Sequence, residues 1–444
     1  MSDQGRNPVV SNALDKRLDR RALLRTGGAV AAGLGAAAVL PSRRGGRARA
    51  AQSGGCSGDD VTLTYGYWDT TQQPGVDAQI AAFEEKYPNI SINLQPIPWG
   101  DYWTKLQTGV AGGSTHDVFW MTGAEFPVYA AQGALVDVQP IIGDGGVDLS
   151  AFPQSLIDLY TNDGKVYGVV RDLDTIGLYY NKELFDAAEV AYPTAEWTWQ
   201  DLRAAAEQLT IKDGDTTTQW GYGSTLSVQQ NLFNFIPQNG GQFFNADRTQ
   251  SLLNEPAACE AILFVTDMIL DGLSPSVAEQ QTSDPYESLF PAGKIAMIPG
   301  GSWHAGRLYE TNPAIDVAPL PQGKQRATMI HGLANVVWSG TEHMCEALEF
   351  VKFLGGREAE QLLADTATVI PAMSGLQEAW RTSVPEANLQ VFLDAVDYSV
   401  PFPSAPTGIE WVGNVEGAMV DTWSGDIPRD QACQRFAEAA NAAL

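Results

Sequence analysis

Tryptophan and carboxylate side chains are the groups in this sequence that could do chemistry together. The chain has 12 tryptophans, and Trp68, Asp69 and Trp120 stand at or near the ends of predicted strands. A flat indole covers the C–H face of a sugar ring, and a carboxylate accepts hydrogen bonds from hydroxyl groups. These residue types are combined in carbohydrate-binding sites and in the clefts of glycoside hydrolases.

The sequence patterns of other catalytic chemistries are missing. Gly300-Gly-Ser-Trp-His304 comes close to a nucleophile elbow, but it has His in place of the last glycine. No P-loop, H-E-x-x-H or dinucleotide-binding glycine pattern occurs. Two of the four histidines have a neighbouring carboxylate, His116 in Asp117 and His343 in Glu342, and neither pair has the ligand spacing of a metal motif. We therefore expect no enzymatic activity, no cofactor and no metal site.

Strands and amphipathic helices alternate from Val61 onward. Residues 61–65 and 90–94 are predicted strands, and the apolar residues between them recur at helical spacing until Pro88. A helix over 101–112 and a strand over 118–121 follow. This order predicts a mostly parallel sheet with helices on both faces. In such sheets ligands bind beyond the carboxyl ends of the strands, where the residues named first are expected.

The length of the chain predicts two domains. A chain of 444 residues is too long for one ordinary core. A second alternating region begins near Leu178, and no repeat, low-complexity tract or Pro/Ser-rich linker separates the two regions. The chain is therefore expected to cross between two lobes through ordered strands, as a hinge requires.

Seven segments resemble, in order and spacing, family 1 of the extracellular solute-binding proteins. These proteins are receptors of ATP-binding cassette (ABC) importers, of the maltose-binding-protein-like, carbohydrate type. The resemblance covers most of residues 60–425. The segments are Phe83–Pro88, His116–Trp120, Tyr129–Leu135, Lys165–Asp172 with Leu178–Leu184, Gly293–Met297 with Gly301–Trp303, Pro319–Gly323 and Ala347–Leu354.

The resemblance implies an α/β, two-lobe periplasmic-binding-protein-like fold with a three-segment hinge. Each lobe would hold a mostly parallel sheet flanked by helices. Lobe 1 would comprise residues 57–171 and 332–385, and lobe 2 residues 172–331 and 386–444. The implied function is to bind a sugar or oligosaccharide between the closing lobes and to deliver it to the ABC permease subunits in the membrane. A monomer is expected.

The resemblance also implies which residues hold the ligand. Trp303 and Trp411 occupy motif positions of tryptophans on which sugars stack in the family, and Asp69 and Asp172 occupy those of polar contacts. The predicted ligand-binding residues are Trp68, Asp69, Trp120, Glu125, Asp172, Trp303, His331 and Trp411. Five other tryptophans are assigned to packing, namely Trp99, Trp103, Trp197, Trp199 and Trp423.

Other functions stay open beside this one. A receptor for a polyamine, peptide, iron complex or glycerol phosphate has the same fold, and Arg171 is the one nearby cation that a phosphate could use. Residues 121–125 lack the acidic residue that maltose binders carry directly after the strand, which argues against maltose itself. A secreted glycoside hydrolase is a further alternative, because the sequence does not exclude paired carboxylates.

The first fifty residues are predicted to be a twin-arginine-type signal peptide. They hold ten of the 27 Lys and Arg. Arg20 and Arg21 precede a Gly/Ala-rich apolar run over 26–40 and a small-residue site at 48–50. A run of this length falls short of the roughly 20 residues that span a bilayer. We therefore expect export to the periplasm or the cell surface.

The remaining chain is strongly acidic. Without residues 1–50 it has 27 − 10 = 17 basic and 53 − 3 = 50 acidic residues, a net charge of −33. Such a surface repels phosphate backbones and anionic lipids, so nucleic acid is not an expected partner.

The four cysteines leave several states open. Cys259, Cys345 and Cys433 are far apart in the sequence, so buried thiols and a single disulfide are both compatible with their spacing. Cys56 is a candidate site for a lipid anchor, although lipoprotein signals favour an aliphatic residue where this chain has Ser53.

Overall fold

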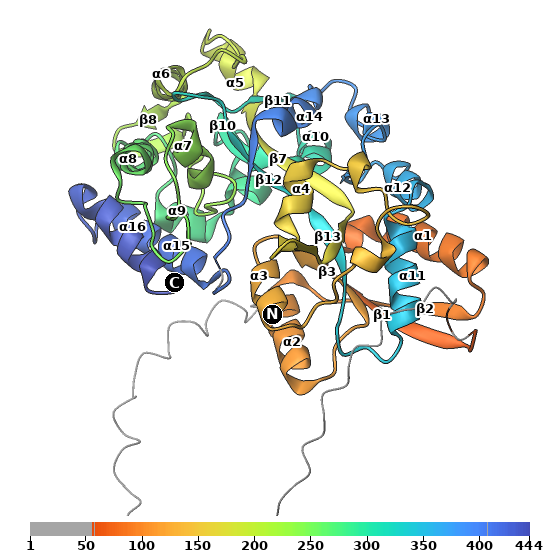
Figure 1. The fold of residues 1–444 in the computed structure, drawn as a ribbon. Helices are drawn as coiled ribbons and strands as arrows, with labels where there is room; N and C mark the ends of the chain where they lie inside the picture. The colour runs from red at the N-terminus through yellow and green to blue at the C-terminus, as the bar shows by residue number, and fades with distance from the viewer. Residues whose placement is uncertain (1–55, 57, 406) are drawn as a thin grey trace, which may run out of the picture. The chain divides into compact units, whose positions relative to one another are not determined.

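A computed structural model of the protein describes Cys56, residues 58–405 and residues 407–444. The predicted leader, residues 1–50, lies outside the described residues. The chain from residue 51 onward forms one compact unit. Within this unit the described residues form two lobes, each built on one β-sheet (Figure 1).

Lobe 1 contains a five-stranded sheet covered by helices. The strand order is β2 (Ile90–Pro96), β1 (Val61–Tyr67), β3 (Val118–Thr122), β13 (Leu333–Val337) and β6 (Gly168–Val170). The helices are α1 (Gln73–Lys86), α2 (Trp99–Gly112), α3 (Phe126–Ala131), α4 (Gln154–Leu159), α11 (Met344–Leu354) and α12 (Arg357–Ala364), and a small hairpin is formed by β4 (Thr161–Asn162) and β5 (Lys165–Val166).

Lobe 2 is built around one long strand, β7 (Asp172–Asn181). Its sheet also contains β10 (Met297–Gly301), β11 (Ile315–Pro319), β12 (Thr328–His331), β14 (Ile370–Pro371) and β15 (Ser399–Pro401). The other elements of lobe 2 are the hairpin β8 (Ile211–Asp213) and β9 (Thr216–Gln219), and the helices α5 (Lys182–Ala187), α6 (Trp199–Leu209), α7 (Leu232–Gln238), α8 (Pro256–Leu270), α9 (Val277–Thr282), α10 (Ala305–Thr311), α14 (Gln390–Asp394), α15 (Glu410–Trp423) and α16 (Ala432–Asn441).

Most strands of each sheet run in one direction, as predicted, and one strand of each, β13 or β7, runs against the others. In lobe 1 only β1 pairs parallel, with β2 and β3, while β13 is antiparallel to β3 and β6. In lobe 2 β7 is antiparallel to all four of its partners, and only β12 and β15 pair parallel. The prediction rested on the first β-α-β units, whereas β13 and β7 are strands that enter from the other lobe. Such a strand need not follow the direction that a helical crossover imposes.

The chain passes between the two sheets at three places. Arg171 joins β6 to β7, and Gly332 joins β12 to β13. The third passage lies between α12 of lobe 1 and β14, which pairs with the first residues of β7, and α13 (Glu378–Arg381) follows it. A Cβ atom at Gly332 would lie 2.5 Å from the carbonyl oxygen of Asp172, so the first two passages can lie this close only with glycine at that position.

Local sequence signals explain where several helices begin and end. The side chain of Thr198 caps the backbone of Asp201 in α6, and the Asp201 carboxylate accepts a hydrogen bond from the Thr198 amide in return. The buried face of α6 is Trp199, Leu202, Ala205, Ala206 and Leu209, at helical spacing. Helix α2 ends where Gly113 takes a left-handed conformation, with φ of 69°.

Two clusters of buried side chains hold the lobes together. One cluster fills lobe 1 and extends under the sheet of lobe 2, and the other lies among the helices of lobe 2. Along β7, Ile176, Leu178 and Tyr180 belong to the second cluster, whereas Tyr179 faces the first. This alternation, the period of a strand buried on both faces, makes β7 part of both cores.

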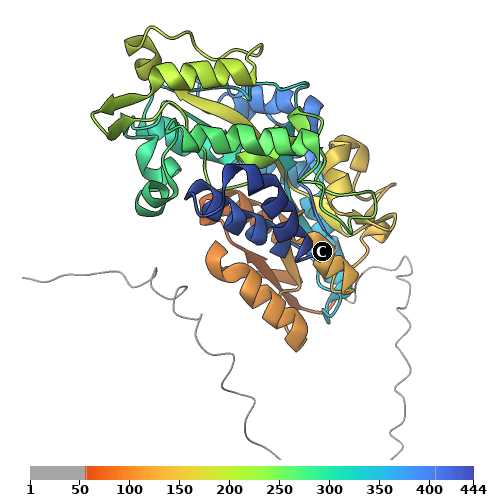
Figure 2. The same ribbon diagram turned by 90° about the vertical axis from the view of Figure 1, so that its left-hand side faces the viewer.

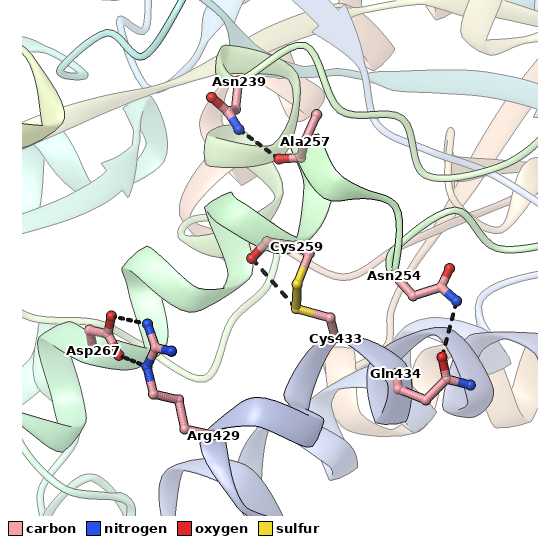
Figure 3. Close-up of a disulfide and its surroundings, with 8 residues drawn as sticks. All are labelled: Asn239, Asn254, Ala257, Cys259, Asp267, Arg429, Cys433 and Gln434. Carbon is pink, nitrogen blue, oxygen red and sulfur yellow. Dashed lines mark hydrogen bonds and ion pairs between the residues drawn. A yellow bond between two sulfur atoms is a disulfide. The ribbon is translucent and has the colours of Figure 1, made fainter.

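The four cysteines form two disulfides. Cys56 is bonded to Cys345, and Cys259 to Cys433. The second bond joins α8 to α16, and the Arg429–Asp267 ion pair and the Asn254–Gln434 hydrogen bond lie around it (Figure 3). In Figure 2 the blue helices α15 and α16 lie beside the green α8. Each disulfide lies within one lobe, so neither restrains the movement of one lobe against the other.

This pairing changes the expectations for the cysteines. The sequence left open buried thiols or one disulfide among Cys259, Cys345 and Cys433, and the structure instead has two disulfides that include Cys56. A lipid anchor would be attached through the Cys56 sulfur atom, which is bonded to Cys345 here. The disulfide and the lipid anchor are therefore mutually exclusive.

A buried guanidinium fixes the first passage between the lobes. Arg171 is 1% exposed, and its Nη1 atom donates to Asp172 Oδ2 at 2.5 Å and to Gln72 Oε1 at 2.7 Å. The guanidinium also lies over the Trp120 ring, 4.0 Å from its centroid. Asp172 Oδ1 accepts the Leu333 amide at 2.7 Å, across the second passage. One buried ion pair thus links both passages to the turn that follows β1.

Replacing Cys259 and Cys433 together by serine should lower the free energy of unfolding by about 2–5 kcal/mol, because the unfolded chain gains freedom. The same is expected of the Cys56→Ser/Cys345→Ser pair. Urea unfolding measures the loss, and reductant, which opens both disulfides, should lower the free energy of unfolding of the unaltered protein by more than either variant does. Free thiols in the denatured, unreduced protein would contradict both disulfides.

Arg171→Met should lower the free energy of unfolding by about 3–5 kcal/mol, because Asp172 is left buried without its cation. Adding Asp172→Asn to this variant should restore part of the loss, since the uncompensated charge is gone. Urea unfolding of the two single variants and the double variant gives the coupling energy. Losses that simply add would mean that the ion pair does not stabilise the passage.

Candidate functional site

Four side chains of lobe 2 converge beside the passages between the lobes. Strand β10 ends at Gly301, and the turn that follows carries Ser302 and Trp303. The Ser302 hydroxyl donates to Asp174 Oδ1. Asp174 pairs with His331 across β7 and β12, and the His331 ring lies 6.2 Å from the Trp303 ring at 86°. Trp303 is 39% exposed, so this group presents an indole face to solvent beside a carboxylate and an imidazole.

Trp68 and Asp69 follow β1 and form the lobe 1 side of the site. Asp69 caps the turn at residues 70–72, where Oδ1 accepts the Thr71 amide at 3.0 Å and Oδ2 accepts Gln72 Nε2 at 2.9 Å. Both oxygens therefore have partners within the protein, and the turn is fixed. Burial raises the pKa of both Asp172 and Asp174, and the Asp69 charge adds to the rise.

Burial dominates the electrostatics of these carboxylates. It raises the pKa of Asp174 well above the ordinary value, and the neighbouring Asp172 charge adds to the rise, while the Ser302 hydrogen bond opposes it. Burial also raises the pKa of Asp172, against the opposing effects of Arg171 and the Leu333 amide. Asp172 is thus saturated by protein partners, whereas Asp174 has one side-chain hydrogen bond. Of the two, Asp174 is the better acceptor for a ligand.

His331 contributes a neutral ring with an unused nitrogen. Burial lowers its pKa to about 3, so the imidazole is uncharged at neutral pH. Its Nε2 atom is buried and has no hydrogen-bond partner among the residues that the structure describes. Buried polar atoms are nearly always paired, so this nitrogen is suited to bind a polar group of a ligand.

Glu125 lies at the beginning of α3 and is partly buried. Burial raises the pKa of its carboxyl group to about 6. Within the described part of the chain, no side chain or amide donates a hydrogen bond to its carboxylate. Glu125 is therefore a second free acceptor at the edge of lobe 1.

A cavity of about 750 Å³ adjoins these residues, and both lobes line it. Phe126 and Asp158 contribute from lobe 1, and Arg248 and Phe402 from lobe 2. None of the eight predicted ligand-binding residues lines the cavity. It borders the group described above, because the Phe402 ring lies 5.2 Å from His331 and Phe126 directly follows Glu125.

Trp120 and Trp411, which the sequence assigned to ligand binding, are core residues in this structure. Trp120 lies inside β3, is fully buried, and donates from Nε1 to the Tyr65 hydroxyl at 2.6 Å. Trp411 is 1% exposed and stacks on Phe233, with centroids 5.3 Å apart and planes at 5°. Trp411 belongs to the buried face of α15, where apolar residues recur at helical spacing. Neither indole has a face open to a ligand here.

Asp174 and Ser302 are site residues that the sequence reasoning missed. The period of a strand could have indicated Asp174, because Asp172 and Asp174 are two residues apart in the segment predicted as a lobe crossing. Ser302 stands inside the motif that was already singled out for Trp303. Trp99 is a different kind of miss, since it was assigned to packing and is 54% exposed.

Two further observations bear on the class of protein. In the described chain no group of three or more His, Cys, Asp or Glu side chains is arranged to hold a metal ion. No helix of the residues described is long and apolar enough to cross a membrane.

Similar proteins are known among both sequences and structures. The chain is 26% identical to the arabinooligosaccharide-binding protein of Bacillus subtilis over 323 residues, which are 70% of this chain and 72% of that protein. It is 25% identical to the diacetylchitobiose binding protein of Streptomyces coelicolor over 329 residues, 71% of this chain and 74% of that protein.

The fold is shared with solved receptors. An ABC substrate-binding protein of Listeria monocytogenes, solved in complex with cycloalternan, superposes with a TM-score of 0.79 and 28% identity, covering 86% of this chain and 99% of that chain. The cyclic alpha-maltosyl-1,6-maltose binding protein of Arthrobacter globiformis superposes with a TM-score of 0.72 at 22% identity, over 87% and 99% of the two chains, which shows likeness of fold. The family described as bacterial extracellular solute-binding protein matches residues 67–361, more than half of the sequence, and the chain belongs to this family.

Proposed function

We propose that the protein is the exported receptor of an ABC importer, that it binds a sugar or oligosaccharide between its lobes, and that it delivers this ligand to the membrane permease. The observation that carries the proposal is the group Asp174, Ser302, Trp303 and His331 beside the hinge. It offers one exposed indole face, a carboxylate and an unpaired imidazole nitrogen. These are the groups that a pyranose requires for stacking and for its hydroxyls.

The names of the similar proteins support a carbohydrate ligand. The arabinooligosaccharide, diacetylchitobiose and cycloalternan that appear in those names are all glycans. The site favours a neutral ligand over a phosphorylated one, because the four residues beside the hinge include no Lys or Arg that could pair with a phosphate. Arg171, the cation that the sequence offered to a phosphate, is buried and already bound to Asp172 and Gln72.

The mechanism we propose is a shift between an open and a closed form. A ligand that touches Trp303 and His331 on one side and Trp68 on the other favours the closed form, because it gains all its contacts only there. No bond of the ligand is broken in this scheme. Both disulfides lie within single lobes, so the three passages can bend without a covalent restraint.

A thermal-shift screen followed by calorimetry and a product assay tests the function. The panel contains malto-, arabino-, galacto- and chito-oligosaccharides, with a polyamine, short peptides and glycerol phosphate as non-sugar probes. We expect saturable stabilisation by one glycan series, with the glycan recovered intact. Cleaved glycan would indicate a hydrolase, and stabilisation by a non-sugar alone would keep the receptor and change its ligand.

Trp303→Ala should weaken binding of the stabilising glycan by more than tenfold, about 1.4 kcal/mol, while the melting temperature of the free protein stays unchanged. The reason is that the exposed indole contributes to ligand contact and little to packing. Trp411→Ala is the matched comparison: it removes a buried stacked ring and should lower the free energy of unfolding by about 3–5 kcal/mol. Calorimetry and urea unfolding separate the two effects. Equal affinities in Trp303→Ala and the unaltered protein would remove Trp303 from the site.

Glycan affinity should fall as the pH drops below about 6, because protonation of Glu125 removes an acceptor for hydroxyl groups. Calorimetry across this range checks the loss, which Glu125→Gln should abolish. The free energy of unfolding changes with pH in the opposite direction from the affinity. Because burial raises the pKa of Glu125, its ionised form destabilises the fold, and stability falls as the pH rises. The gain in stability of Glu125→Gln should therefore appear as the pH rises through about 6.

Glu416→Gln is the control for this experiment. Glu416 is also partly buried with a raised pKa, but it accepts the Val228 amide within lobe 2. Its variant should keep the pH dependence of affinity. A dependence that survives in Glu125→Gln would assign it to another group.

A further inference from the structure

Trp99 stands at the end of the strand next to the one that carries Trp68. Strands β1 and β2 are parallel neighbours, and Tyr67 pairs with Pro96 at their carboxyl ends. Trp68 follows β1 directly, and Trp99 begins α2 shortly after β2. The two indoles therefore project from adjacent positions at one edge of the sheet, the edge where ligands bind in such folds.

Trp99 is the most exposed large apolar side chain in the described part of the protein, at 54%. Its immediate neighbours Pro98, Gly100 and Asp101 are exposed as well. A Cβ atom added at Gly100 would meet nothing within 4 Å, so no other segment covers this place. An indole left in water forgoes the large gain that burial of a tryptophan gives. The Trp99 ring is thus free for a ligand to stack on.

Trp99 is nevertheless held in place. Its ring centroid lies 5.1 Å from that of Trp68 at 67° and 5.6 Å from that of Trp103 at 89°. Trp68 in turn packs edge-on against Tyr102 and the buried Trp120, at 4.9 and 5.3 Å. The three indoles of Trp68, Trp99 and Trp103 form an aromatic cluster, with planes at 49° to 89° to one another, that is anchored in the core of lobe 1. A ring that its neighbours already hold loses little conformational entropy when a ligand stacks on it.

We infer that Trp99 is an additional subsite, which stacks a sugar ring of an oligosaccharide whose other part lies at Trp68 and Trp303. The inference rests on the proposed function and narrows its ligand from sugars in general to oligosaccharides. Contact with Trp68 gives the reason for this occupant, because the Trp99 ring lies against Trp68, a residue of the proposed site, with centroids 5.1 Å apart. Asp101, an exposed residue in the first turn of α2, forms an ion pair with Lys105 at 3.6 Å, and carboxylate oxygens can also accept hydrogen bonds from sugar hydroxyls.

Calorimetry with chain-length series tests the inference. The probes are the malto-, arabino-, galacto- and chito-oligosaccharides from disaccharide to hexasaccharide, titrated into the unaltered protein and into Trp99→Ala. In the series that binds, affinity should increase with chain length. Trp99→Ala should weaken the longer members about tenfold and leave the disaccharide unchanged. Trp99→Phe keeps an aromatic face and should retain most of the affinity.

Ile211→Ala is the matched control, because Ile211 is 52% exposed on lobe 2, in the hairpin strand β8. It should bind every chain length as the unaltered protein does. If Trp99→Ala binds every chain length as tightly as the unaltered protein does, the subsite is refuted while the sugar receptor stands. An equal loss for the disaccharide and the hexasaccharide would also overturn it, since Trp99 would then act only through Trp68. If the unaltered protein binds none of the four series, the proposed function and the subsite are refuted together.

Discussion

The structure around the hinge depends on one buried cation. The Arg171 guanidinium is almost completely removed from water, and a charge in that position is tolerated only when it is paired and hydrogen-bonded. Asp172 supplies the charge, Gln72 the hydrogen bond and Trp120 an aromatic face. These partners come from the turn after β1, from β3 and from the passage itself, so the guanidinium fixes their relative positions. Because Asp172 also binds the Leu333 amide, the second passage is included.

This constraint separates residues that hold the site from residues that are free to bind. Asp172 has its oxygens occupied by Arg171 and Leu333, and Asp69 has its own occupied by the turn that it caps. Asp174, by contrast, has a single side-chain partner in Ser302, and His331 Nε2 has none among the described residues. Asp174 and His331 lie opposite each other on neighbouring strands, next to the exposed face of Trp303. We therefore take the number of protein partners, rather than residue type, as the guide to the ligand contacts.

The tryptophans show the same separation. Trp120 and Trp411 are buried and contribute to the cores, whereas Trp303 and Trp99 expose large parts of their rings. The cores of the two lobes are continuous through β7, and the covalent bonds stay within each lobe. Neither disulfide joins the two lobes, so the three passages are the covalent connections between them. Such a division suits a receptor that closes on its ligand.

The sequence by itself determined the classes of structure and the motifs. Strand and helix periodicity located β1, β2, β3 and α2 to within a few residues, and the ordered motifs around Asp172 and Trp303 indicated the family. These signals are local. A period of two or of 3.6 residues, or a short motif, can be recognised from neighbouring residues of one segment.

The tertiary structure alone decided the reversed direction of β7 and β13, the cysteine pairing and which tryptophans face solvent. Each of these depends on segments that are far apart in the chain: β7 meets β10, β11 and β12 from elsewhere in the sequence, and Cys56 meets Cys345 across 289 residues. Burial of Trp411 depends on Phe233, and exposure of Trp99 depends on the absence of any segment above it. A side chain's environment is set by its neighbours in space, and the periodicity of its own segment does not show which distant residues these are.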